Sequence, residues 1–267
     1  MITENRLRTL ARKNKVTTGL MEKDYVNSWI LYSIFNNEQV NQKLVFKGGT
    51  LLHKIYFPDK WRFSEDLDLT ATQDINLEEF KEDLQRSLSE CSSLSGIGFE
   101  ITSFHSNPGY IQIKIQYDAL LGQKNTTRID VSSEEEILFK TILKKHNLED
   151  IPEFDINCYS LDEIFIEKIR SLFQRNRARD YYDVYRMYNE YDHNLDKLTG
   201  PLKEKMRLKN VSLNLEITED KRNDLKDYWE WALSKFISNV EFPDFEVVME
   251  DIDELINELK EIDEDFR

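Results

Sequence analysis

The sequence is poor in the residues that build disulfide frameworks and zinc sites. Its 267 residues include only two cysteines, Cys91 and Cys158, which lie far apart and have no metal-ligand spacing. Four histidines are present, and no two of them form a pair at the spacing that zinc enzymes use. The cysteines are therefore expected to be reduced core thiols, and neither a disulfide scaffold nor a zinc hydrolase is indicated.

Long apolar runs are also missing. No stretch approaches the roughly 20 consecutive apolar residues that a membrane-spanning helix needs. The N-terminus does not open with a basic segment followed by an apolar one, as a secretory signal would. A cytoplasmic protein without a membrane partner is expected.

Positive charge is the third shortage. The formal net charge is −15, which disfavours a nucleic-acid partner because phosphate contacts dominate such affinities. Residues 241–267 hold twelve acidic and two basic residues, so this segment carries −10 and the preceding chain only −5. The segment could be a solvated helix face, a shield for a basic groove or a binder of a basic partner. Apolar residues at helical spacing favour a packed helix: Ile252, Leu255, Ile256 and Leu259.

Glycine is scarce, and no glycine-rich turn leads into Gly-Lys-Ser/Thr, so a P-loop is excluded. The one paired glycine stands in Lys47-Gly48-Gly49-Thr50, between the apolar strand predicted at 44–46 and a helix predicted at 50–57. Glycine lets a backbone approach a phosphate closely, and a strand–turn–helix aims amide groups at an anion. Lys47, Gly48, Gly49 and Thr50 are therefore candidates for nucleotide binding.

A carboxylate pair follows this turn within the segment Arg62-Phe63-Ser64-Glu65-Asp66-Leu67-Asp68-Leu69. On a strand, Asp66 and Asp68 point to one face while the leucines point into the core. Two hard oxygen ligands side by side suit Mg²⁺. A lone Asp-x-Asp is usually a solvated strand end, but its position after Gly-Gly-Thr makes the combination far more specific.

Three further residues extend this candidate site. Asp130, on a strand predicted at 126–132, has the same polarity as Asp68 and adds a third carboxylate. Arg62 is a phosphate candidate on charge. Ser64 would share the face of Asp66, as a phosphate contact, a modification site or simply a hydrogen-bonding partner.

Together these segments resemble the signature of the AbiEii/AbiGii nucleotidyltransferase toxins, relatives of DNA polymerase β that include the MenA-type toxins of mycobacteria. One departure is that Thr50 stands where the wider superfamily usually has serine, about fifteen residues before Asp66. The resemblance covers roughly residues 20–190 and rests on the segments 21–26, 47–52, 54–56, 62–69 and 179–183.

The resemblance implies an α+β fold, in which a polymerase-β-like nucleotidyltransferase domain with a mixed sheet precedes a helical C-terminal domain. Strand-like alternation at 97–104 and 109–117 agrees with a sheet, and from Leu161 onward the pattern is almost wholly helical. We place the catalytic domain with its N-terminal helices at 1–155. Residues 156–267 are expected to form a helical domain that completes the nucleotide site and ends in an acidic helix.

The same resemblance implies nucleotidyl transfer from a nucleoside triphosphate, with Mg²⁺ or Mn²⁺ held by Asp66, Asp68 and Asp130. Two metal ions about 3.5–4 Å apart stabilise the attacking and leaving oxygens in such a reaction. Lys168 is implied to bind the triphosphate, although a surface helix lysine is the alternative. In the motif Arg179-Asp180-x-x-Asp183, the resemblance implies a catalytic role for Asp180 and nucleotide binding by Arg179. The alternative is an acidic first helical turn stabilised by the macrodipole.

By this resemblance the protein is a toxin that works with a cognate antitoxin in a toxin–antitoxin or abortive-infection system that defends against phage. Its acceptor would be RNA, namely the 3′ end of a tRNA. Two alternatives stay open. One is nucleotidyl or phosphoryl transfer to a protein or a small molecule, and the other is a non-catalytic nucleotide-binding partner module, against which the three intact aspartates speak.

Overall fold

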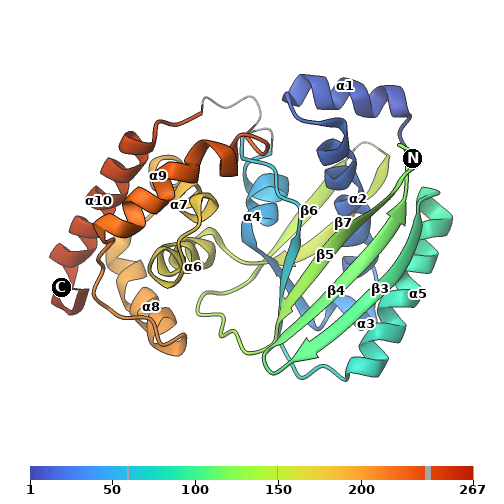
Figure 1. Ribbon diagram of the computed structural model, residues 1–267. Helices are drawn as coiled ribbons and strands as arrows, with labels where there is room; N and C mark the ends of the chain where they lie inside the picture. Colours follow the sequence, from blue (N-terminus) through green and yellow to red (C-terminus); the bar gives the residue numbers. More distant parts are fainter. Residues whose placement is uncertain (59, 149, 238–241, 267) are drawn as a thin grey trace. The chain divides into compact units, whose positions relative to one another are not determined.

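The computed structural model describes residues 1–58, 60–148, 150–237 and 242–266 (Figure 1). The chain forms two compact units. The first comprises Met1–Glu135, Thr141–Tyr159 and Phe236–Val240, and the second comprises Glu136–Lys140, Ser160–Lys235 and Glu241–Arg267. A mixed sheet in the first unit and helices in the second confirm the α+β class predicted from the sequence.

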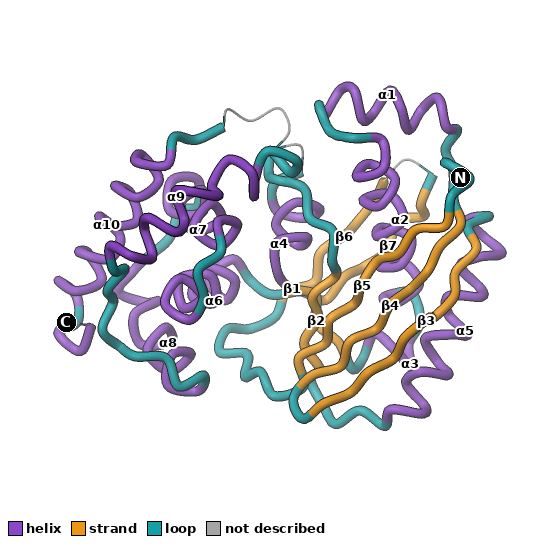
Figure 2. The backbone as a smooth tube through the Cα atoms, viewed as in Figure 1, coloured by secondary structure: helices purple, strands orange, loops and turns teal. Residues whose placement is uncertain are grey.

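A seven-stranded sheet in the order β3-β4-β5-β2-β1-β7-β6 forms the centre of the first unit (Figure 2). β1 pairs antiparallel with β2 and parallel with β7, β2 pairs parallel with β5, and the β3–β4, β4–β5 and β6–β7 pairs are antiparallel. β1 is buried along its whole length, as expected of a central strand covered on both faces. The strands are β1 Leu44–Lys47, β2 Leu67–Ala71, β3 Gly98–Asn107, β4 Tyr110–Asp118, β5 Lys124–Ser132, β6 Ile142–Leu148 and β7 Ile151–Cys158.

Helix α2 is the main packing element of the first unit. It begins after Thr17, whose side chain accepts a hydrogen bond from the Leu20 amide, and it packs against α1, α5 and β7. Because neighbours surround it, most of its residues are buried and it has no polar stripe. The helices of this unit are α1 Glu4–Asn14, α2 Thr18–Phe35, α3 Glu38–Asn41, α4 Gly48–Leu51, the π-helical turn η1 Leu52–Tyr56 and α5 Leu77–Ser95.

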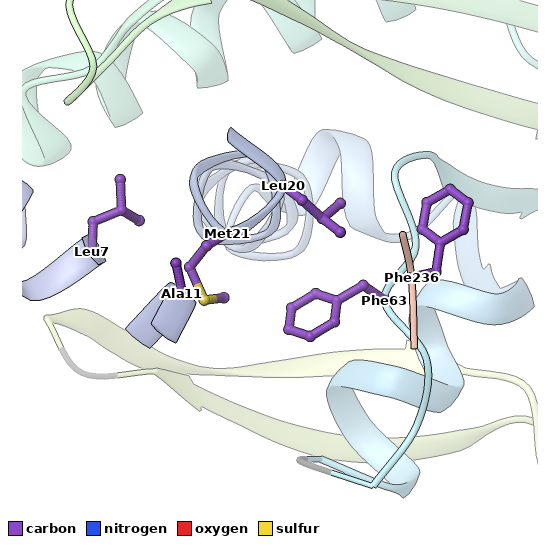
Figure 3. Close-up of a cluster of buried hydrophobic side chains, with 6 residues drawn as sticks. All are labelled: Leu7, Ala11, Leu20, Met21, Phe63 and Phe236. Carbon is purple, nitrogen blue, oxygen red and sulfur yellow. The ribbon is translucent and has the colours of Figure 1, made fainter. Parts of the chain in front are cut away.

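A buried apolar cluster ties a distant part of the chain to the first unit (Figure 3). The Phe63 amide donates to the backbone oxygen of Phe236 at 2.8 Å, and both side chains are buried. The cluster consists of Leu7, Ala11, Leu20, Met21, Phe63 and Phe236. Since Phe63 lies three residues before Asp66, this packing fixes the approach to the predicted carboxylate pair.

The second unit is helical and ends in an amphipathic helix, α10. The stripe Ile252, Leu255, Ile256 and Leu259 is buried, and α10 packs on α7 and α8. No helix of the described residues is long and apolar enough to cross a membrane. The elements are α6 Leu161–Gln174, α7 Ala178–Glu190, α8 Leu195–Leu208, α9 Glu219–Leu233, α10 Phe245–Ile262 and the 3₁₀ turn η2 Glu264–Phe266.

A buried ion pair anchors residues 136–140 in the second unit. Lys205 Nζ lies 2.7 Å from Glu163 Oε1, and both side chains are almost fully buried. Glu163 Oε2 accepts the backbone amides of Leu138 and Phe139 at 2.9 and 2.8 Å. The carboxylate therefore satisfies two backbone donors while Lys205 balances its charge.

The sequence pattern does not predict strands β6 and β7. β6 is an edge strand whose central residues are polar and mostly exposed, so it lacks apolar alternation. Pro152 interrupts the apolar pattern of β7. It lies opposite the irregularity in the β6–β7 register, which shifts on β6 between His146 and Leu148. A proline is tolerated at such an irregularity because no ladder hydrogen bond needs its missing N–H.

A buried polar cluster lies beside α2. Lys54 Nζ donates to Asp24 Oδ1, the Asp24 backbone oxygen and Ser28 Oγ at 2.7, 2.8 and 2.9 Å. Although burial opposes ionisation, Lys54 and His53 hold the pKa of Asp24 below its usual value. Burial, together with the Lys54 charge, lowers the pKa of His146 to about 4, so this histidine is neutral in the folded protein at neutral pH.

The buried His146 predicts a pH dependence of stability. The histidine of the unfolded chain titrates near pH 6.5. Between pH 6.5 and pH 4 it is therefore protonated in the unfolded chain but neutral in the folded protein. The stabilisation present above pH 6.5 is thus lost as the pH falls. From this group alone we expect the free energy of unfolding to fall by about 2 kcal/mol from pH 7 to pH 5. Urea unfolding at both pH values measures it, and His146→Gln should remove this component. Equal pH dependence in the two proteins would contradict a neutral buried His146.

Candidate active site

A row of polar side chains crosses four adjacent strands of the sheet. The register pairs Lys47 with Asp68, Asp68 with Asp130, and Asp130 with Gln112. Laterally paired residues point to the same face of a sheet and lie close together. The fold therefore brings two of the predicted metal ligands side by side on β2 and β5, with Lys47 beyond one and Gln112 beyond the other.

Asp66 stands one residue before β2, and three contacts hold its segment. Thr50 Oγ1 donates to the Asp66 backbone oxygen at 2.5 Å, and Asn27 Nδ2 donates to the Glu65 backbone oxygen at 3.0 Å. Thr127 Oγ1 also donates to the Glu65 oxygen, at 3.1 Å. Leu67 and Leu69 are fully buried, so the alternation predicted for the Asp-x-Asp strand is the one observed.

The paired glycines lie against two charged side chains. Gly48 has φ +81°, and a Cβ placed on it would come within 2.4 Å of Asp68 Oδ2. A Cβ on Gly49 would come within 2.7 Å of Arg62 Nη2. Both glycines are therefore required for the close approach of the Asp68 carboxylate and the Arg62 guanidinium to the backbone.

The predicted phosphate-binding side chains Lys47, Arg62 and Ser64 are all buried. Lys47 Nζ lies 2.8 Å from Glu135 Oε2 and donates to Ser132 Oγ at 3.2 Å. Arg62 Nη1 donates to the Phe63 backbone oxygen at 3.2 Å. Lys47 thus lies beside Asp68 in the strand register and Arg62 lies against Gly49, and their role in phosphate binding stays a prediction.

Arg128, Tyr110 and Gln112 contact the carboxylates and were not among the residues expected from the sequence. Arg128 Nη2 lies 2.5 Å from Asp66 Oδ2, and its Nε lies 3.6 Å from Asp130 Oδ2. Tyr110 Oη and Gln112 Nε2 donate to Asp130 Oδ1 at 2.5 and 3.1 Å. The spacings Arg128-x-Asp130 and Tyr110-x-Gln112 are the signal that could have placed them on this face.

Two pKa shifts accompany these contacts. Burial and the hydrogen bond to Asp130 raise the pKa of Tyr110 to about 12, so its hydroxyl keeps the proton that it donates. Burial alone would lower the pKa of Arg128, but the hydrogen bond to Asp66 and the nearby Asp130 charge raise it. Both donors therefore stay protonated beside the carboxylates.

The chemistry of the three carboxylates suits a divalent cation, but an arginine already contacts Asp66 and lies near Asp130. Hard carboxylate oxygens are the ligands that Mg²⁺ prefers. Among the described residues, however, no group of three histidine, cysteine or carboxylate side chains is arranged to hold a metal ion. The cation in contact with Asp66 and nearest Asp130 in this arrangement is the Arg128 guanidinium.

The helical unit carries its own buried ion-pair group. Lys168 Nζ lies 3.0 Å from Asp180 Oδ1 and 2.8 Å from Asp183 Oδ2, and Arg175 Nε lies 2.7 Å from Asp180 Oδ2. Although burial opposes ionisation, Lys168 and Arg175 hold the pKa of Asp180 well below its usual value. The fold thus brings Lys168 on α6 into contact with Asp180 on α7. Arg179, also on α7, is half-buried. Their roles in catalysis and nucleotide binding stay predictions.

Two comparisons with known proteins identify similar proteins. A family model described as nucleotidyl transferase AbiEii toxin, type IV toxin–antitoxin system, matches residues 29–251. The chain is similar in structure to MenT4, a nucleotidyltransferase toxin from Mycobacterium tuberculosis H37Rv, with a TM-score of 0.59, 16% identity and 98% of each chain covered. No curated protein sequence matches the chain.

The Gly48 geometry predicts that Gly48→Ala destabilises the protein. The left-handed φ costs a non-glycine residue about 1 kcal/mol or more, and the new Cβ must displace the Asp68 carboxylate. We expect the free energy of unfolding to fall by about 2 kcal/mol or more. Gly19→Ala is the matched control, since a Cβ there meets nothing within 4 Å. Equal stability of the two variants in urea unfolding would contradict the close approach at Gly48.

Replacing Lys168 should destabilise the protein whatever its role in the reaction. Lys168→Met removes the cation shared by Asp180 and Asp183, and breaking a buried pair in this way typically costs about 3–5 kcal/mol. Lys197→Met, at an exposed position on α8, is the control. Urea unfolding of both variants measures the effect. A loss below about 1 kcal/mol for Lys168→Met would show that the two carboxylates do not depend on this lysine.

Proposed function

Because the AbiEii model matches most of its length, the chain belongs to the AbiEii family of nucleotidyltransferase toxins of type IV toxin–antitoxin systems, and we propose that it transfers nucleotides from a nucleoside triphosphate to the 3′ end of a tRNA. The observation that carries the proposal is the placement of Asp68 beside Asp130 on adjacent strands, with Asp66 two residues before Asp68. Gly48, the first residue of α4, lies against Asp68 and completes the arrangement.

The proposed reaction is attack of the acceptor hydroxyl oxygen on the α-phosphorus, with pyrophosphate as the leaving group. Asp66, Asp68 and Asp130 would hold the divalent cation, Mg²⁺ or Mn²⁺, which stabilises the negative charge that develops on the oxygens. Tyr110 and Gln112 orient Asp130 by donating to its Oδ1.

Other predicted site residues would bind and orient the nucleotide. Lys47, which pairs laterally with Asp68, and Arg62, which lies against Gly49, would supply positive charge for the phosphates. The roles predicted for Thr50, Ser64, Lys168, Arg179 and Asp180 belong to the same proposal. The proposal also includes a cognate antitoxin that neutralises the protein and a function in abortive infection of phage-infected cells. Membership in a toxin family supports both.

Nucleotide transfer by the purified full-length chain tests the proposal. The protein is incubated with total RNA, Mg²⁺ and each α-labelled nucleoside triphosphate in turn, and the products are separated on a denaturing gel. We expect label in RNA of tRNA size and a loss of roughly a thousandfold or more in Asp68→Asn, because several kcal/mol of charge stabilisation disappear. Asp118→Asn, at an exposed position on β4, should keep full activity.

Other labelling results would favour one of the alternative functions. Label on protein would replace tRNA by a protein acceptor, and no label with any nucleotide would favour a binding module. RNA whose 3′-terminal diol has been oxidised with periodate should no longer accept label. Persistent labelling of such RNA would overturn the 3′-end assignment.

A further inference from the structure

The guanidinium of Arg128 lies among the carboxylates that are expected to bind the metal. Its Nη2 is 2.5 Å from Asp66 Oδ2 and its Nε is 3.6 Å from Asp130 Oδ2. The longer distance is not a hydrogen bond, and the buried Nε has no hydrogen-bond partner. Arg128 therefore balances the charge of one carboxylate, Asp66, through one good hydrogen bond, and its Nε donor is left unfulfilled.

We propose that Arg128 is a resident cation that competes with the divalent metal ion for Asp66 and Asp130. The inference rests on the proposed function, since it assumes that the carboxylates bind a metal. A metal ion can use the Asp66 oxygen only after the guanidinium has released it. The metal-competent state is then the fraction of molecules in which Arg128 has turned away, and the apparent metal affinity is lowered by that fraction.

The position of Arg128 suits such an exchange. Its side chain is 41% exposed, so the guanidinium can swing into water without burying its charge. It stands on β5 two residues before Asp130, so both side chains project from the same face and the arginine stays close after release. Without an internal cation the carboxylates would repel one another, and with it they remain together until a metal ion arrives.

Metal binding in the absence of nucleotide tests this competition. Mn²⁺ is titrated into the full-length protein by isothermal calorimetry, with Arg128→Gln compared with wild type. We expect Arg128→Gln to lower the Kd for Mn²⁺ by roughly five- to tenfold, because binding no longer has to break a charge-assisted hydrogen bond. Arg128→Lys should lie between the two, since an ammonium lacks the planar fork of arginine.

Lys114→Gln is the matched control, because Lys114 pairs laterally with Arg128 on β4 and its loss changes the net charge equally. Through solvent-screened charge alone it should change the Kd by less than about twofold. An unchanged or weaker Mn²⁺ affinity in Arg128→Gln would overturn the competition, as would an equal gain in Lys114→Gln.

A double variant separates this outcome from failure of the proposed function. Asp68→Asn added to Arg128→Gln should abolish Mn²⁺ binding. If Mn²⁺ still bound, the metal would lie elsewhere and the proposed function itself would lose its site. If binding required Asp68 but did not respond to Arg128, only the competition would be wrong.

Discussion

The mutual repulsion of three neighbouring carboxylates, Asp66, Asp68 and Asp130, is the constraint on which the candidate site depends. The parallel pairing of β2 with β5 places Asp68 beside Asp130, and Asp66 follows from the alternation before β2. Like charges at such short range repel, so each carboxylate needs its own compensation. Arg128 contacts Asp66, Tyr110 and Gln112 donate to Asp130, and Lys47 pairs laterally with Asp68, for which Gly48 leaves space against the backbone.

The surrounding packing holds the carboxylate segment in place. Phe63 is buried in an apolar cluster with Phe236, a residue far away in the sequence. Asn27 on α2 and Thr50 on α4 donate hydrogen bonds to successive backbone carbonyls, those of Glu65 and Asp66. A site of this kind needs side chains fixed to a fraction of an ångström, and rigid helices and strands supply that precision better than a free loop does.

Buried lysines organise the helical unit in a comparable way. Lys205 joins Glu163 and Glu167, and Lys168 joins Asp180 and Asp183. A buried charge pair contributes little net stability, but removing one partner leaves the other uncompensated in a low dielectric. Loss of activity on changing Lys168 is therefore informative about catalysis only when folding is measured alongside it.

The sequence by itself determined the Asp-x-Asp strand, because strand alternation is a local pattern, while its resemblance to the AbiEii toxins indicated the family and the α+β class. It also indicated Asp130, whose polarity matches that of Asp68. It missed β6 and β7, where an exposed polar edge and Pro152 hide the strand pattern. Only the tertiary structure decided that Arg128 meets Asp66 and that Asp68 packs on Gly48. Both contacts depend on how distant strands register, and one sequence does not encode that pairing in any local period.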